Sequence, residues 1–301
     1  LTIIYAGVRN GIERVSKFMM PILIVLSVLI AVYSVTRPGA MEGVKYFLVP
    51  NVKNFSWMTV VAAMGQMFYS LSIAMGILIT FGSYMKKETS LEDSTRNVEV
   101  FDTAIAIMAG LMIIPAVFSF SGGDPDTLQA GPALMFITIP KVFENMGFGT
   151  VVGILFFLLV LFAAVTSSIA LTESAVSTFE DELGWSRRRA TVLVGVIMIA
   201  LGSLSSLGYG PLAGIKIIGM QFLDFFDFLT NSVMMPIAAM LTSLFVSRIV
   251  GMKRMEEEIM HGESTFRRKK IFIVMIKYLC PVFALIILIS SVANAFGWIA
   301  M

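Results

Sequence analysis

The sequence predicts an all-α polytopic membrane protein. Of its 301 residues, 57% are hydrophobic and only 14% are charged, and the mean hydropathy is +0.87. Soluble domains carry roughly 25% charged residues, so a chain this apolar must bury most of its surface in lipid or against its own helices. Its apolar runs are too long and continuous for the strands of a membrane barrel. Helices are the other structure that satisfies every backbone polar group in lipid.

Seven apolar runs have the length of about 20 residues that a bilayer-crossing helix needs. We name them spans A to G and treat residues 1–301 as one transmembrane domain. They cover about 12–35, 57–84, 98–120, 150–182, 188–206, 222–248 and 271–293. The long connection 121–149 contains an amphipathic stretch, about 132–146, that predicts a further helix. It lies either over the outer mouth of the protein or as a surface helix at the membrane interface.

Lysine and arginine alternate between the two sets of loops, and this orients the spans. One set of loops holds 16 of the 22 basic residues and the other holds five, while Lys277 lies inside span G. By the positive-inside rule the richer side is cytoplasmic. We therefore expect a protein of the cell inner (plasma) membrane whose span A runs outward and whose C-terminus lies outside.

Few features point to other classes of protein. The net charge is +2, and the basic residues form loop clusters rather than the stripe that nucleic-acid binding requires. The single cysteine, Cys280, excludes an internal disulfide, and its apolar surroundings indicate a packing role. The single histidine, His261, lies in a charged loop, which argues against a histidine-based metal or catalytic site.

Span B carries polar and small residues near its middle, from Tyr69 and Ser70 through Ser72 to Gly76. Such residues permit a helix to unwind and free its carbonyl oxygens. Secondary transporters build mid-membrane sites from discontinuous helices of this kind. We therefore predict that span B is broken; the alternative is that the small residues only allow close helix packing.

Span D carries three consecutive hydroxyls, Thr166, Ser167 and Ser168. Helical spacing places Ala163, Thr166 and Ser167 on one face, which we expect to turn to span A or the interior. A hard cation such as Na⁺ prefers several oxygen ligands at short range, as Ca²⁺ and Mg²⁺ do. The alternative is that the hydroxyls bond to the preceding helical turn and pack.

Three carboxylates lie in or near apolar runs. Asp102 lies about two turns into span C and needs a cation, an arginine or a proton as its partner; if the helix starts later, it is interfacial. Asp224 and Asp227 lie among aromatic residues at the outer end of span F. Alternatively, Asp224 and Asp227 are a solvated pair whose negative charge is stabilised by the positive end of the helix dipole.

The motifs of several spans resemble the neurotransmitter:sodium symporter family, and its bacterial amino-acid transporters in particular. They occur in the family's order along nearly the whole chain, and they are Gly11-Ile12-Glu13-Arg14, Gly65-Gln66-Met67-Phe68-Tyr69-Ser70-Leu71-Ser72, Gly82-Ser83-Tyr84, Phe162-Ala163-Ala164-Val165-Thr166-Ser167-Ser168-Ile169-Ala170 and Phe179-Glu180-Asp181-Glu182-Leu183. The resemblance implies the LeuT-type fold of two inverted five-helix repeats. Spans A to G would correspond to the fifth to eleventh spans.

The resemblance also implies that an N-terminal part, holding spans one to four, is missing and is needed for function. The chain opens with Leu1 rather than methionine, inside what resembles the end of a helix. We therefore expect a fragment with the last helix of repeat one, all of repeat two and one further span.

By resemblance, two sodium sites map onto the chain. Ser70 and Asp102 match ligands of the first sodium, and the carbonyl of Ala163 with the hydroxyls of Thr166 and Ser167 match the second. The residues that match the substrate pocket are Tyr69, Ser70, Ser72, Met75, Ser167 and Leu171. Met75 and Leu171 beside Tyr69 suggest an amino acid with an apolar or aromatic side chain.

The resemblance further assigns gates. Tyr69 and Asp227 match the outer gate, and Tyr84 and Asp181 match the inner gate, whose arginine partners would lie in the missing part. Chloride-dependent members carry a serine where this chain has Ala106. We therefore expect that Na⁺ is the co-transported ion and that chloride is not required.

Gly11 and Pro21 in span A match a glycine-to-proline spacing of the family's fifth span. Pro21 has no N–H, so the carbonyl of Lys17 loses its helical donor. Gly11 adds backbone freedom at the other end. We expect this hinge to unwind and open a water path to the second sodium; the alternative is an ordinary proline kink.

Two classes of function remain to be compared. The favoured one is a sodium-coupled symporter of amino acids that works by alternating access. The alternative is a channel-like pore or a membrane enzyme. The sequence shows none of the His/Asp, HExxH or cysteine clusters of an enzyme, and neither a repeated filter loop nor a charged ring of a channel.

Overall fold

The structure is a computed structural model and describes residues 1–124, 131–262 and 265–298. These residues form two compact units. Unit 1 holds Leu1, Ser56–Glu99 and the chain from Ala170 onward, and unit 2 holds Thr2–Phe55 and Val100–Ile169. Apart from one isolated bridge between Ile217 and Met220, the described residues contain no β-structure. The predicted all-α fold is confirmed.

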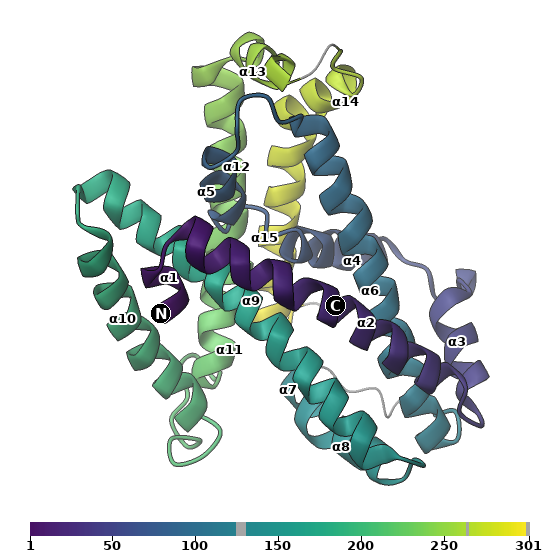
Figure 1. Cartoon of the computed structure of the whole chain (residues 1–301). Helices are drawn as coiled ribbons and strands as arrows, with labels where there is room; N and C mark the ends of the chain where they lie inside the picture. The colour runs from purple at the N-terminus through teal and green to yellow at the C-terminus, as the bar shows by residue number, and fades with distance from the viewer. Residues whose placement is uncertain (125–130, 263–264, 299–301) are drawn as a thin grey trace. The chain divides into compact units, whose positions relative to one another are not determined.

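Unit 2 contains spans A and C, the first part of span D, and the connections between spans A and B and between spans C and D (Figure 1). Its elements, two of which are shared with unit 1, are α1 Thr2–Tyr5, π-helical η1 Val8–Glu13, α2 Arg14–Val35, α3 Ala40–Leu48, the short 3-10 helix η2 Val52–Asn54, α6 Leu91–Ser121, α7 Gly131–Ala133, π-helical η4 Leu134–Thr138, α8 Ile139–Glu144 and α9 Gly149–Leu183. The segment α7–η4–α8 covers the helix expected at about 132–146. Residues 125–130 of this connection lie outside the described residues.

The core of unit 2 joins α2, α6, α8 and α9. Large apolar side chains from all four helices contact one another there, including Ile30, Val117, Val142 and Phe156, each at most 2% exposed. The ring of Phe156 meets that of Phe143 edge to face. Because α8 contributes Val142 and Phe143 to this core, the helix expected at about 132–146 packs against α2, α6 and α9. Its place relative to the membrane stays a prediction.

Unit 1 contains span B, the end of span D and spans E to G. Its further elements are α4 Trp57–Ser70, α5 Ile77–Ser83, α10 Arg187–Leu207, α11 Phe222–Asp227, π-helical η5 Phe228–Met234, α12 Met235–Phe245, π-helical η6 Val246–Val250, α13 Met252–Ile259, the 3-10 turn η7 Met260–Gly262, α14 Lys269–Val274, π-helical η8 Met275–Leu279 and α15 Cys280–Ala295. In the described residues, six helices are long and apolar enough to cross a membrane; span B is absent from these because it is split.

The break in span B confirms the prediction made from its small and polar residues. The helix α4 ends at Ser70, and α5 begins at Ile77. Between them Ser72 and Ala74 have positive φ angles of 55° and 63°, and Gly76 has a φ of 80°. Side chains with a Cβ rarely adopt this left-handed region, so the turn is held by its surroundings rather than by local preference.

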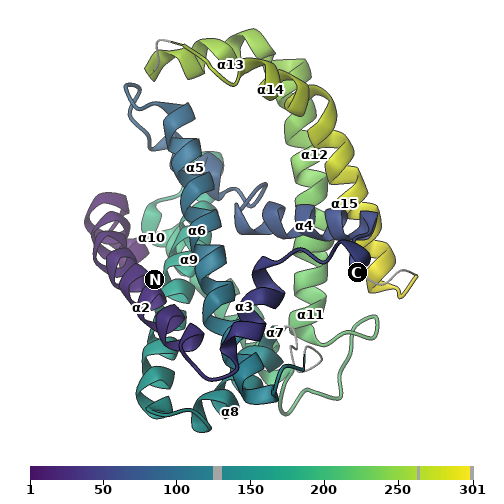
Figure 2. The ribbon, with the colours of Figure 1, turned by 90° about the vertical axis from the view of Figure 1, so that its right-hand side faces the viewer.

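Spans F and G pack side by side as α12 and α15, and α4 runs across them (Figure 2). A π-helical segment, η8, precedes Pro281 in span G. Pro281 has no N–H to give to the carbonyl five residues before it, which belongs to Ile276. The buried hydroxyl of Ser243 in α12 donates a hydrogen bond to that carbonyl at 2.5 Å. A side chain of one span therefore satisfies a backbone group that the neighbouring span leaves open.

Replacing Ser243 with alanine should destabilise the F–G pair, because the carbonyl of Ile276 would keep no donor in an apolar setting. Interhelical hydrogen bonds in membranes contribute about 1 kcal/mol, so the thermal unfolding midpoint of the full-length protein should fall modestly. Ser247→Ala is the matched control, since Ser247 only bonds back to Leu244 in its own helix. Equal midpoints for the two variants would contradict the assignment.

Candidate functional site

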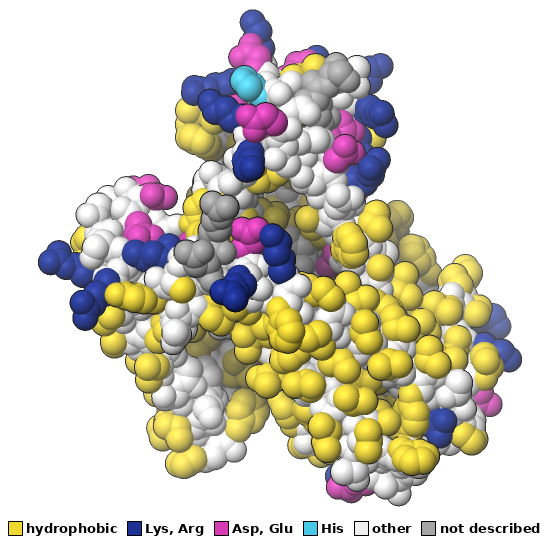
Figure 3. All heavy atoms as spheres, in the orientation of Figure 1, with side chains coloured by type: hydrophobic (Ala, Val, Ile, Leu, Met, Phe, Trp, Pro, Cys, Tyr) yellow, Lys and Arg dark blue, Asp and Glu magenta, His cyan; other side chains and the backbone are white. Residues whose placement is uncertain are grey.

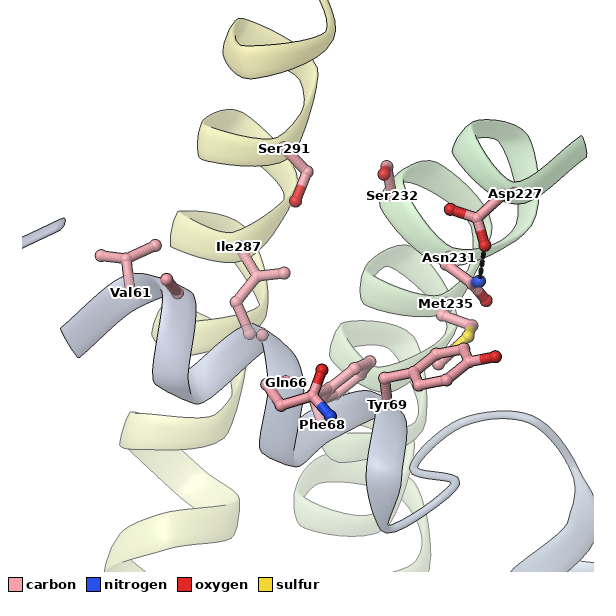
Figure 4. A pocket seen from close by; sticks show the side chains of 12 residues that line it. Val61, Gln66, Phe68, Tyr69, Asp227, Asn231, Ser232, Met235, Ile287 and Ser291 are labelled. Atoms are coloured by element: carbon pink, nitrogen blue, oxygen red, sulfur yellow. Dashed lines mark hydrogen bonds between the residues drawn. The ribbon is translucent and has the colours of Figure 1, made fainter. Parts of the chain in front are cut away.

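A pocket of about 470 Å³ in unit 1 lies among α4, η5, α12 and α15. Its apolar wall includes Phe68 and Tyr69 of α4, Met235 of α12 and Ile287 of α15 (Figure 4). A cavity of this size is within the range for small-molecule ligands. Tyr69, predicted as part of both the substrate pocket and the outer gate, lines it with its side chain half exposed.

The opposite wall of this pocket is polar. Asp227, Asn231 and Ser232 line it from the outer part of span F, and Ser291 faces them from span G (Figure 4). The amide of Asn231 donates to the carboxylate of Asp227 at 2.5 Å and fixes its orientation. The two predicted outer-gate residues, Tyr69 and Asp227, are therefore brought to one pocket. Asn231 was not identified from the sequence, although it lies one helical turn after Asp227.

The substrate residues predicted on span B flank its break. Ser70 is the last residue of α4, while Ser72 and Met75 lie in the turn and are half buried. Leu171 belongs to the same unit, on α9, and is exposed. Ser167 belongs to unit 2, so its place in the substrate pocket stays a prediction.

The first predicted sodium site draws Ser70 from unit 1 and Asp102 from unit 2. The pair stays a prediction for the same reason. The structure does settle where Asp102 lies along its helix: α6 begins at Leu91, seven residues before the expected start at 98. Asp102 therefore lies eleven residues into α6, and its depth in the membrane stays a prediction.

The second predicted sodium site lies within unit 2, on α9. The hydroxyl of Thr166 donates to the carbonyls of Phe162 and Ala163, both at 3.0 Å. Thr166 is half buried, whereas Ser167 is exposed. The expectation of an inward position is thus supported for Thr166 and not for Ser167. These bonds to the preceding turn are the ones expected if the hydroxyl serves only helix packing. They also hold the Thr166 oxygen beside the carbonyl of Ala163.

A buried ion pair on the predicted inner side was missed in the sequence. Glu173 of α9 is fully buried, and Arg187 at the start of α10 contacts its carboxylate at 3.1 and 2.5 Å. Arg187 also binds Glu180 at 3.1 Å, and the hydroxyl of Tyr84 donates to Glu173 at 2.8 Å. A buried carboxylate requires this kind of pairing. The signal was available, because Glu173 is an acid within an apolar span.

A hydroxyl cluster lies beside this ion pair. Thr80 of α5 is buried and hydrogen bonds to Ser174 and Ser177 of α9 at 3.4 and 3.3 Å. At Gly76 a Cβ atom would come within 2.6 Å of the Ser174 hydroxyl. Helix α5 therefore approaches α9 so closely that only glycine fits at its start, and this contact holds Tyr84 near Glu173.

The other predicted gate and hinge residues have simpler surroundings. Asp181, the second predicted inner-gate residue, is exposed near the end of α9. Gly11 lies in the π-helical segment η1, and Pro21 lies inside α2. The chain is helical from Gly11 through Pro21 in this structure, so the proposed unwinding of that segment stays a prediction.

Comparisons with known proteins give the family. The model of the sodium:neurotransmitter symporter family matches residues 1–297 of this chain. The chain belongs to the sodium:neurotransmitter symporter family. The family inferred from the motifs is thereby confirmed, and the six apolar helices in the described residues fit a multi-pass membrane protein.

Relatives of this symporter chain include two bacterial proteins described as uncharacterized sodium-dependent transporters. YhdH of Bacillus subtilis is 36% identical over 262 residues, which are 87% of this chain and 57% of the relative. The Haemophilus influenzae protein is 33% identical over 290 residues, 96% of this chain and 62% of the relative. The chain therefore spans about three fifths of the length of the curated relatives it matches.

Among solved structures, the symporter chain resembles the crystal structure of MhsT in complex with L-phenylalanine. The TM-score is 0.82 at 36% identity, over 96% of this chain and 65% of MhsT. This likeness confirms the LeuT-type fold.

Proposed function

We propose that the protein to which this chain belongs is a sodium-coupled symporter of amino acids that works by alternating access. The observation that carries the proposal is the broken span B, whose outer half lines a ligand-sized pocket through Tyr69 while Asp227 lines the same pocket from span F. Discontinuous helices form substrate and ion sites in secondary transporters. The sodium-dependent names of the relatives support the ion coupling.

Sodium would bind at the two sites inferred from the motifs. The second site is supported by the position of the Thr166 hydroxyl beside the carbonyl of Ala163, because neutral oxygens on one helix face suit a hard cation. At the first site Asp102 would supply a negative charge and Ser70 a neutral oxygen. With Ala106 nearby offering no hydroxyl to hold an anion, chloride would not be required.

The substrate class follows from the residues that the resemblance assigns to the substrate site and from one neighbour. Met75 and Leu171 are apolar and Tyr69 is aromatic, and the MhsT structure holds L-phenylalanine. We therefore infer an amino acid with an apolar or aromatic side chain. Its ammonium and carboxylate groups would be met by polar groups at the break in span B and by the first sodium.

Gating would use the two ends of unit 1. On the outer side Tyr69 and Asp227 flank the pocket. On the inner side Tyr84 donates to Glu173, whose carboxylate also binds Arg187, and this contact would close the space between α5 and α9, with Asp181 nearby in the chain. Unwinding between Gly11 and Pro21 would open the inward route for sodium. The positive-inside rule places this inner side in the cytoplasm and the C-terminus outside.

Uptake by the full-length protein in proteoliposomes tests this function. Labelled apolar and aromatic amino acids should accumulate saturably when sodium is supplied outside, and an equimolar potassium gradient should abolish the uptake. Linear, non-saturating flux would indicate a pore instead. Chemical conversion of the substrate would indicate an enzyme.

In the same assay, replacing chloride by gluconate should leave uptake nearly unchanged, because the Asp102 carboxylate supplies the charge that an anion would otherwise bring. Asp102→Asn is the informative partner variant, since it removes that charge and should weaken sodium dependence in either medium. A large loss of uptake in gluconate by the unmodified protein would contradict chloride independence.

A further inference from the structure

Span G carries a lysine that neither the gates nor the sodium sites use. Lys277 lies eight residues after Lys269, the first residue of α14, and its side chain is exposed. At 1.5 Å per helical residue, this places it about 12 Å along the span. An ammonium group at that depth is costly unless it reaches water or an anion.

The surface around Lys277 is apolar and runs along one face of the helix. Ile271, Val274, Tyr278 and Val282 recur at intervals of three or four residues and are between 47% and 65% exposed. The face continues through Leu285 and Ile289 toward the end of α15. A continuous exposed stripe of this length on a candidate membrane span suits the acyl chain of a lipid.

Basic side chains gather around α13 and α14 (Figure 3). Two of the cations in this region are neutralised: Arg268 binds Glu99 at 2.9 Å, and Lys269 binds Glu256 at 2.5 Å. Within the part of the chain that the structure describes, Lys270 and Lys277 have neither a hydrogen-bond nor an ion-pair partner. Lys253 and Arg254 of α13 also have no ion-pair partner among the described residues; of these four cations, Lys270 and Lys277 are the two that lie on span G.

The helix geometry directs both lysines the same way. Cα–Cβ bonds tilt toward the N-terminus of a helix, and span G begins on the side that we propose to be cytoplasmic. The side chain of Lys277 thus leans toward the cytoplasmic surface, where lysine tips reach headgroups while their stems stay in the apolar layer. Lys270 lies two turns closer to that surface, so the two ammonium groups can approach one phosphate.

We propose that Lys270 and Lys277, with Tyr278 beside them, bind the headgroup of an anionic phospholipid of the cytoplasmic leaflet. The apolar stripe from Ile271 to Ile289 would hold its acyl chain. Juxtamembrane lysines attract anionic lipids near the membrane surface. The proposal rests on the orientation given under the proposed function, but not on sodium coupling or on the substrate.

Thermal unfolding of the full-length protein in detergent, without sodium or substrate, tests the site independently of transport. Added phosphatidylglycerol should raise the unfolding midpoint more than phosphatidylcholine does. This difference should disappear in Lys270→Gln/Lys277→Gln and return in Lys270→Arg/Lys277→Arg. Lys253→Gln removes an exposed lysine of α13 and is the matched control, which should keep the difference.

Because the comparison is made between two lipids within each variant, a change in basal stability does not obscure it. Soluble glycerol phosphate should have no effect, since it lacks the acyl chain. An equal rise with both lipids in the unmodified protein would overturn the proposal. So would an undiminished phosphatidylglycerol effect in the double glutamine variant.

Discussion

Arg187→Ala should be among the most destabilising single substitutions in unit 1. It would leave the carboxylate of the fully buried Glu173 with the hydroxyl of Tyr84 as its one remaining hydrogen-bond partner among the described residues. Removing one partner of a buried ion pair costs about 3–5 kcal/mol. We expect a large fall in the thermal unfolding midpoint of the full-length protein and loss of transport.

The asymmetry of the pair provides the control. Glu173→Gln should lower the unfolding midpoint less than Arg187→Ala does, because Arg187 is partly solvent-exposed and keeps Glu180 as a partner. Adding Glu173→Gln to Arg187→Ala should therefore recover part of the lost stability. Arg188→Ala removes an adjacent exposed arginine and should change little. If the double variant is as unstable as Arg187→Ala, stranded charge is not the cause.

Ser167→Ala should raise the sodium concentration for half-maximal uptake while leaving expression nearly unchanged. The loss of one oxygen ligand worth about 1.4 kcal/mol corresponds to about tenfold. Thr166→Ala should act in the same direction and should also lose the bonds that hold this turn of α9. Sodium titration of uptake in proteoliposomes gives the measurement.

Ser168→Ala is the matched control, because Ser168 is the neighbouring hydroxyl that the motif does not assign to sodium. Its half-maximal sodium concentration should stay close to that of the unmodified protein. A Ser167→Ala variant with an unchanged sodium response would remove Ser167 from the site. Its exposure in the structure would then reflect an ordinary surface position.

Local chemistry made the break in span B predictable. Ser70, Ser72 and Gly76 weaken a helix where hydrocarbon would otherwise favour it, and the break between Ser70 and Ile77 follows. The positive φ angles of Ser72 and Ala74 were not predictable, because neither residue prefers that conformation. They depend on the contact of α5 with α9, where Ser174 lies against Gly76.

The ion pair between Glu173 and Arg187 could not be predicted from the sequence, for a different reason. The sequence places an acid in an apolar span and an arginine fourteen residues later, but it does not say which cation the acid meets. The resemblance assigned the arginine partners of the gates to spans outside this chain. Only the turn between α9 and α10 brings Arg187 back to Glu173.

By itself, the sequence determined the all-α class, its apolar character and the break in span B, because these follow from composition, periodicity and local helix preference. The family was indicated separately, by the resemblance of its motifs. Tertiary structure alone decided which polar groups share a site. It brought the Ser243 hydroxyl to the carbonyl of Ile276 and Arg187 to Glu173. The physical reason is that a buried polar group must be paired, while the partner it finds depends on how distant helices pack.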